Sequence, residues 1–130
     1  MQWYVGKCLR LGLLVVLLAG CTTVHPREPV GSGTYSYVSG RLSWVYPVPL
    51  IEAWQATLQA LQELNLRVLN KTLDGLGGEI DAQRADQTTV DVDLKPLSDR
   101  TTEVSVRIGT FGDYEQSKNI HETIRTRLKL

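Results

Sequence analysis

The spacing of hydrophobic residues along the chain changes from one expected element to the next. Alternation from Tyr35 to Tyr46 predicts a single strand. The residues expected on one face of it are Val38, Gly40, Leu42, Trp44 and Tyr46. Steps of three and four residues then predict an amphipathic helix to about Leu64, with Pro49 in its first turn. The expected buried stripe of this helix is Ile51, Trp54, Leu58, Leu61 and Leu64.

The rest of the chain predicts four further strands and a closing helix. Asn65 can adopt the left-handed conformation that ends a helix, and a strand is expected to open at Leu66. Strands are expected at 66–69, 79–82, 90–94 and 104–108, with turns at 73–78, 85–87 and 98–100. Asp113 can cap the last helix, with Gln116 three residues further on. The expected buried stripe of that helix is Ile120, Ile124 and Leu128.

These elements follow one another in the order β-α-β-β-β-β-α. Strands joined by short turns pair antiparallel, and each expected strand has one apolar and one polar face. Each helix carries a single apolar stripe, so both helices are expected on the apolar side of the sheet. We therefore predict an α+β domain over residues 34–130. It is a two-layer sandwich, with an antiparallel sheet of about five strands and two helices on one face.

The first 20 residues have a different character and predict an export signal. Their only charged residues are Lys7 and Arg10, and residues 11–19 contain neither a charge nor a hydrogen-bonding side chain. A basic region followed by a short apolar region and small residues is typical of a secretory signal peptide. The apolar stretch is too short for a permanent span, which needs ~20 apolar residues.

The signal ends in Leu18-Ala19-Gly20-Cys21, which resembles the lipobox of bacterial lipoproteins. The resemblance implies that a signal peptidase recognises Leu18, Ala19 and Gly20 and cuts before Cys21, whose thiol carries a diacylglyceryl group. Two or three acyl chains would anchor the protein in a membrane, because each buried methylene contributes ~0.8 kcal/mol. Thr22, where Asp would favour the inner membrane, implies the outer membrane and a periplasm-facing domain. Two alternatives stay open: an ordinary secreted protein with an incidental cysteine, and an uncleaved anchor.

Residues 21–33 are expected to be the lipidated cysteine and a flexible tether. The segment contains two Pro and two Gly and has few hydrophobic residues, a composition typical of linkers. Twelve flexible residues reach ~20 Å root-mean-square. His25 lies in this tether, where a solvated spacer residue is expected rather than a metal ligand.

Charge and cysteine content narrow the classes of function. The chain has 14 basic and 14 acidic residues, and removal of residues 1–20 leaves 12 basic and 14 acidic ones. This balance argues against nucleic acid as a partner, because binding to it needs Lys and Arg massed on one face. Cys8 is lost with the signal, so the mature domain has no disulfide and no free thiol for a metal.

Two polar segments of the domain are candidates for ligand binding or catalysis. Residues 109–113 form a glycine-containing loop before a helix, which could cradle an anion, although a tight turn with Phe111 packed inward is the expected role. Asp91 and Asp93 share a strand face, beside Glu79, Asp81 and Glu103 on neighbouring strands. Such carboxylates could bind a cation or act in acid–base chemistry. The same alternation adds Arg67, Lys71 and Arg107, which favours a mixed, solvated face.

Histidine and the aromatic residues offer two more candidates. His121 is expected at the edge of the last helix, and the sequence has no Ser or Cys nucleophile in a recognisable elbow motif. A ligand pocket between the first strand and the first helix could have Trp44, Tyr46 and Trp54 as its floor. Their spacing is more typical of core residues.

Several segments of the domain carry a family resemblance. They are Tyr46-Pro47, Ala53-Trp54, Leu64-Asn65-Leu66, residues 78–82 and residues 101–113. In these the chain resembles a family of small bacterial lipoproteins classed as a domain of unknown function. The resemblance implies a lipoprotein context and an α+β fold, and it transfers no catalytic residue.

The sequence favours a lipid-anchored envelope module that binds another envelope protein or has a structural role, with no cofactor and no metal. The alternative is a carrier for a small ligand, such as a lipid or glycan fragment, in a cleft between helices and sheet. An enzyme is least expected, because the sequence offers no set of nucleophile, base and acid.

Overall fold

The computed structural model describes residues 34–130, so the expected signal, the lipobox at 18–21 and the tether with His25 lie outside the described residues. The strands are β1 (Tyr35–Val38), β2 (Arg41–Tyr46), β3 (Arg67–Asp74), β4 (Gly77–Gln83), β5 (Thr89–Ser98) and β6 (Thr101–Ile108). The helices are α1 (Leu50–Glu63) and α2 (Tyr114–Arg127). The order within the sheet is β1-β2-β6-β5-β4-β3, and every pair is antiparallel.

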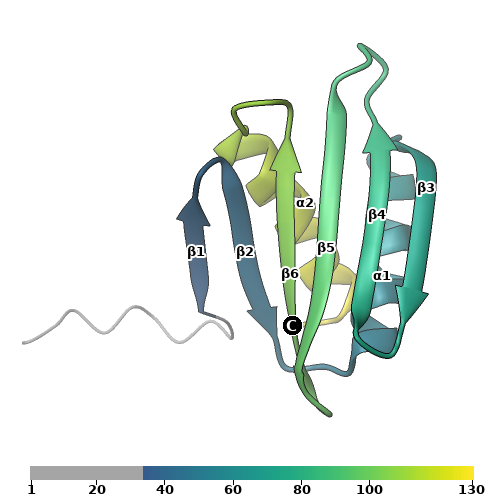
Figure 1. Ribbon diagram of the computed structural model, residues 1–130, viewed down its shortest axis with the longest axis vertical. Coiled ribbons are helices and arrows are strands. Elements are labelled where there is room, and N and C mark those ends of the chain that lie inside the picture. Colours follow the sequence, from purple (N-terminus) through teal and green to yellow (C-terminus); the bar gives the residue numbers. More distant parts are fainter. Residues whose placement is uncertain (1–33) are drawn as a thin grey trace, which may run out of the picture.

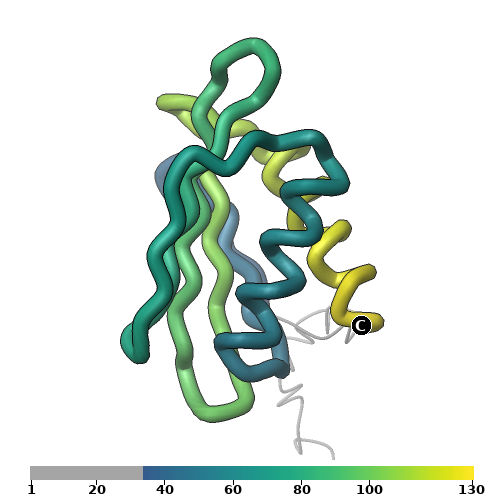
Figure 2. Tube along the Cα trace, turned by 90° about the vertical axis from the view of Figure 1, so that its right-hand side faces the viewer, coloured from purple at the N-terminus to yellow at the C-terminus, as the bar shows by residue number. Residues whose placement is uncertain are grey.

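The domain has two layers. Both helices lie side by side on one face of the sheet, and the other face is uncovered (Figures 1 and 2). On β4, β5 and β6 the residues that face the helices are buried in alternation, as in Ile80 and Ala82 of β4. The predicted α+β sandwich with antiparallel strands and helices on one face is therefore confirmed, with six strands instead of about five.

The extra strand arises because the expected strand from Tyr35 to Tyr46 is a hairpin. Ser39 and Gly40 have φ values of 51° and 77°, and two consecutive residues with positive φ form the tight turn that joins antiparallel strands. The register pairs Val38 with Arg41, so Val38 faces away from the side on which Leu42 and Tyr46 are buried. The prediction of one face for Val38 and Leu42 was wrong.

Helix α1 packs through small residues, which rotates its buried stripe from the one expected. Its buried residues are Ala53, Trp54, Ala56, Thr57, Ala60 and Leu61. Ile51 was expected inside but is 54% exposed, while Leu58 and Leu64 are only partly buried against the core. Alanine lets the helix backbone approach the sheet closely, so the contact surface lies where the alanines are.

Strand β3 contains an irregularity that changes the face of one predicted residue. Its register with β4 shifts between Val68 and Asn70, and Lys71 then pairs with Ile80. Because paired residues share a face, Lys71 lies on the helix side of the sheet and not on the polar face where alternation placed it. The strand also continues to Asp74, so the turn is shorter than the expected 73–78.

The ends of the helices follow the sequence signals. Asn65 has φ 57°, as expected for a residue that closes a helix, and the backbone N–H of Leu66 donates to Leu61 O at 2.9 Å. The Asp113 carboxylate accepts a hydrogen bond from the Gln116 backbone N–H at 3.0 Å. Both predicted caps are confirmed.

Two glycines join the β1–β2 turn to the loop before α2. A Cβ on Gly112 would lie 2.1 Å from the carbonyl oxygen of Gly40, and a Cβ on Gly40 would lie 2.3 Å from that of Phe111. Both glycines also have positive φ, at 77° and 81°. The two loops therefore meet backbone to backbone, and only glycine fits on either side.

This joint gives a stability prediction. We expect Gly112→Ala to lower the free energy of unfolding by about 2 kcal/mol, because the methyl group adds a backbone clash to an unfavourable φ. Gly75→Ala is the matched control, because nothing lies within 4 Å of the added Cβ. Urea unfolding of the two variants checks this prediction. Equal free energies of unfolding would contradict the close backbone contact between Gly40 and Gly112.

Candidate functional site

A buried aromatic network connects α2 to β2. The Tyr46 hydroxyl lies 2.8 Å from Nδ1 of His121, and Nε2 of His121 lies 2.9 Å from the carbonyl oxygen of Leu42. The Trp44 and Tyr46 rings stack, with centroids 6.3 Å apart, and the His121 ring packs against both. Tyr46 and His121 are fully buried. The expectation of His121 at a helix edge was wrong.

The hydrogen bonds determine the protonation of this network. A carbonyl oxygen only accepts, so Nε2 of His121 carries the proton, and Nδ1 accepts from the Tyr46 hydroxyl. Burial lowers the pKa of His121 to about 4, although the bond to Leu42 acts in the opposite direction. Burial also raises the pKa of Tyr46 above its ordinary value. Both side chains are therefore neutral at pH 7, and they fix α2 on the sheet.

The three predicted aromatic residues do not form one pocket. Trp44 and Tyr46 belong to the network beneath α2, whereas Trp54 packs its ring against Gly78 of β4. Tyr46 and Trp54 are buried, and Trp44 is partly buried against the core. Their expected role in the core is confirmed.

A small cleft opens where β1 and β2 meet α2. It measures about 150 Å³ and is lined by Tyr35, Leu42, Trp44, Tyr114 and Lys118. The Tyr35 and Trp44 rings are in tilted contact, with centroids 5.8 Å apart. Because the Lys118 ammonium lies 3.9 Å from the Glu122 carboxylate, the cationic group in the lining already has an anionic neighbour.

Exposed aromatic and apolar side chains lie on both faces of the corner where the β1–β2 turn meets the loop before α2. We call this the aromatic corner, and it comprises Tyr37, Val38, Phe111 and Tyr114. Phe111 is 90% exposed and Val38 65% exposed, so the expected inward packing of Phe111 was wrong. The Tyr37 and Tyr114 rings meet edge to face, with centroids 5.3 Å apart. The backbone contact between Gly40 and Gly112, which we call the glycine joint, connects the two loops that carry these residues.

Residues 109–113 form a tight connection between β6 and α2, as expected. Gly109 and Gly112 have φ values of 69° and 81°. The carboxylate of Asp113 already accepts from a backbone N–H in the first turn of α2, so an anion there would meet a negative charge. The turn role, and not anion binding, agrees with this geometry.

The polar face of the sheet holds the carboxylates that the sequence singled out. Asp91 is paired with Arg107 at 2.9 Å, and Asp93 is paired with Arg41. The second pair spans β6, on which Ser105 is nearly buried and hydrogen-bonded to Ser43 at 2.7 Å. The expected mixed face of acids and arginines is confirmed for these residues.

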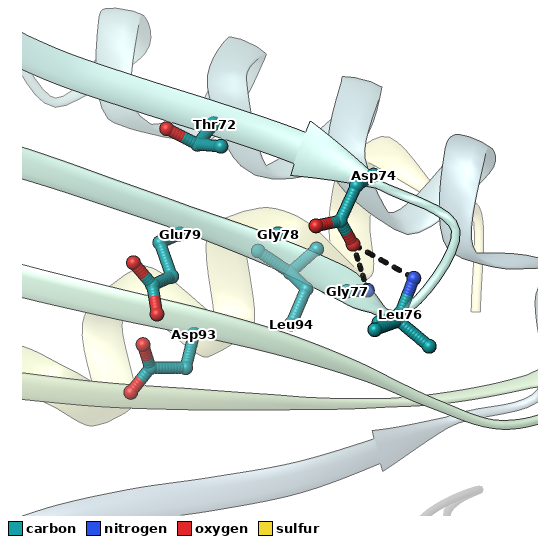
Figure 3. Close-up of a pocket in the computed structure, with 8 residues that line it drawn as sticks. All are labelled: Thr72, Asp74, Leu76, Gly77, Gly78, Glu79, Asp93 and Leu94. Atoms are coloured by element: carbon teal, nitrogen blue, oxygen red, sulfur yellow. Dashed lines mark hydrogen bonds between the residues drawn. The ribbon is translucent and has the colours of Figure 1, made fainter.

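A shallow polar hollow lies on this face beside the β3–β4 turn (Figure 3). Its volume is about 530 Å³, and Asp74, Glu79 and Asp93 contribute carboxylates to its lining. Glu79 and Asp93 are direct cross-strand partners. Within residues 34–130, no three His, Cys, Asp or Glu side chains are arranged to hold a metal ion.

The buried histidine predicts a pH dependence. Below pH ~6.5 the imidazole of the unfolded chain binds a proton, whereas the folded one stays neutral down to about pH 4. Stability is therefore lost as the pH falls through this window, by about 2 kcal/mol between pH 7 and pH 5.

Urea unfolding at the two pH values checks this, with His25→Gln expected to keep the dependence and His121→Gln to lose it. NMR titration of the native protein measures the His121 pKa directly. A value near 6.5 would contradict the buried neutral state.

Neither helix within residues 34–130 has the length and apolar character of a membrane-spanning helix. A comparison with curated proteins finds no match. The family described as "Protein of unknown function (DUF3568)" matches residues 7–127. Since this match covers nearly the whole chain, the protein belongs to the DUF3568 family.

Proposed function

We propose that this protein is a lipid-anchored lipoprotein of the outer membrane, and that its periplasm-facing domain binds another envelope protein without catalysis. Cys21 and the three-part signal before it support the anchor. The family match spans residues 7–127, so it includes the apolar region and Cys21.

The aromatic corner is the observation that carries the binding role. Aromatic residues are enriched at the centres of protein interfaces, where a few of them supply most of the binding energy. Phe111 is almost fully exposed, and the core makes no use of it. The glycine joint holds its loop in place before a partner arrives, which reduces the entropy lost on binding.

A protein partner fits the geometry better than a small-ligand carrier does. Pockets for ligands of drug size measure ~300–1,000 Å³ and enclose most of the ligand surface. The apolar cleft beside the corner is about 150 Å³, too small for an acyl chain or a sugar chain. The larger hollow of about 530 Å³ is polar and lies open on the sheet face.

A catalytic role receives no support from the histidine of the domain. Both ring nitrogens of His121 are engaged within the core, by Tyr46 and by the carbonyl of Leu42. A general base must reach the proton that it removes, and this ring is fully buried.

The anchor is tested by replacing the cysteine. We expect Cys21→Ala to abolish acyl labelling, because the cysteine sulfur is the atom that would be lipidated. The signal should then stay uncleaved, and the fractionation of the protein should change. Cys8→Ala is the matched control and should behave as the wild type, since Cys8 lies in the removed segment. Unchanged labelling in Cys21→Ala would overturn the lipoprotein assignment.

The binding surface is tested by position-specific crosslinking in cells. A photoreactive residue at position 111 should give a discrete adduct, and one at Leu69 should not. Leu69 is a fair control because it is 54% exposed and lies on the opposite edge strand. Val38→Asp should reduce the adduct at 111 severalfold without changing thermal stability. Equal adducts at both positions, or none at 111, would contradict the proposal.

A further inference from the structure

The chain enters the domain at the end opposite the aromatic corner. The carbonyl oxygen of Thr34 accepts a hydrogen bond from the Val45 N–H at 3.1 Å, one residue before β2 ends. In the register between β2 and β6, Tyr46 pairs with Thr102, which lies just after the β5–β6 turn. The start of β1, the β3–β4 and β5–β6 turns and the start of α1 therefore lie at one end, which we call the tether end (Figure 1).

Three large aliphatic side chains project into solvent at the tether end. Leu76 in the β3–β4 turn is 88% exposed, Ile51 in the first turn of α1 is 54% exposed, and Leu97 near the β5–β6 turn is 50% exposed. Leu76 lies in a turn, whereas Ile51 belongs to α1 and Leu97 to the last residues of β5. The three side chains share one end of the domain, and apolar residues that are exposed together can serve as a contact surface for an apolar partner.

The β3–β4 turn is built so that its leucine points outward. The carboxylate of Asp74 accepts hydrogen bonds from the backbone N–H groups of Leu76 and Gly77, at 2.7 Å and 3.1 Å (Figure 3). The acidic group is thereby folded back onto the turn, and the Leu76 side chain, at the border of the hollow that it helps to line, stays 88% exposed.

We infer that the tether end is a lipid-contact surface, in which Leu76, Leu97 and Ile51 enter the headgroup region of the membrane that holds the anchor. The inference rests on the proposed lipid anchor at Cys21. Twelve residues separate Cys21 from the domain, and a flexible chain of that length would have a root-mean-square reach of ~20 Å. A six-stranded sheet is ~24 Å wide at ~4.8 Å per strand, so every turn of the tether end can reach the same bilayer.

The charges at this end fit a shallow contact. Asp99 and Arg100 both lie in the β5–β6 turn and are exposed, and Glu52 follows Ile51. Charges of both signs match zwitterionic headgroups, whereas the hydrocarbon core would exclude them. The leucines therefore enter the interface while the charged groups stay among the headgroups.

This contact would orient the domain. The aromatic corner lies at the far end of β1 from Thr34, so it would face away from the bilayer. A tether alone leaves the domain free to rotate, and contact at three turns removes most of that freedom.

The test uses the full mature lipoprotein in vesicles of phosphatidylethanolamine and phosphatidylglycerol. A single cysteine replaces Leu76 or Leu97 and carries a polarity-sensitive fluorophore, and Phe111→Cys is the matched control at the opposite end. The expected result is a blue-shifted emission at positions 76 and 97, with severalfold stronger quenching by lipid-borne quenchers than at position 111. Leu76→Asp combined with Leu97→Asp should return a probe at position 51 to the emission seen in water.

The outcomes separate this inference from the lipid anchor. Mass spectrometry reports acylation of Cys21 in the same sample. If the protein is acylated and the three probes behave alike, the orientation is wrong and the anchor stands. If Cys21 carries no lipid, the proposed function itself fails. A blue shift of the emission at position 76 that depends on protein concentration and not on lipid concentration would indicate contact with a second copy of the chain. That result would also overturn the lipid contact.

Discussion

The contact of His121 with β2 is the interaction on which the arrangement of the domain depends. A buried imidazole needs partners for both nitrogens, and only one placement of α2 supplies the Leu42 carbonyl and the Tyr46 hydroxyl together. That placement brings Tyr114, at the start of α2, against Tyr37 on the edge strand. The cleft and the aromatic corner are thus consequences of a polar contact inside the core.

Local patterns were enough to predict most of the fold. Strands β4, β5 and β6 show alternating burial, and the caps at Asn65 and Asp113 act through neighbouring residues, so short segments carried the information. The β1–β2 hairpin was missed because Ser39-Gly40 is a weaker turn signal than Asn-Gly, and the alternation on both sides resembles one strand. The face of Lys71 was missed because a shift at the bulge depends on the partner strand.

The site was less predictable, because exposure depends on contacts far apart in the sequence. Phe111 stays outside because the backbone of Gly112 packs against that of Gly40. No local sequence pattern shows that these two glycines will be in contact. His121 did carry a signal. Together with Ser117, Ile120 and Ile124 it follows the i, i+3, i+4, i+7 spacing of a buried stripe, and all four residues are buried. A histidine inside such a stripe points to a buried hydrogen-bonded role.

Under the proposed lipid anchor, the irregularity in β3 has a consequence for crowding at a membrane surface. This strand forms one border of the sheet, where unsatisfied backbone groups could recruit a second molecule. The shift between Val68 and Asn70 breaks the row of donors and acceptors, and Arg67, Lys71 and Asp74 place charges along it. Copies anchored as proposed would collide often in the membrane plane, and a kinked, charged edge strand disfavours their pairing into a continuous sheet.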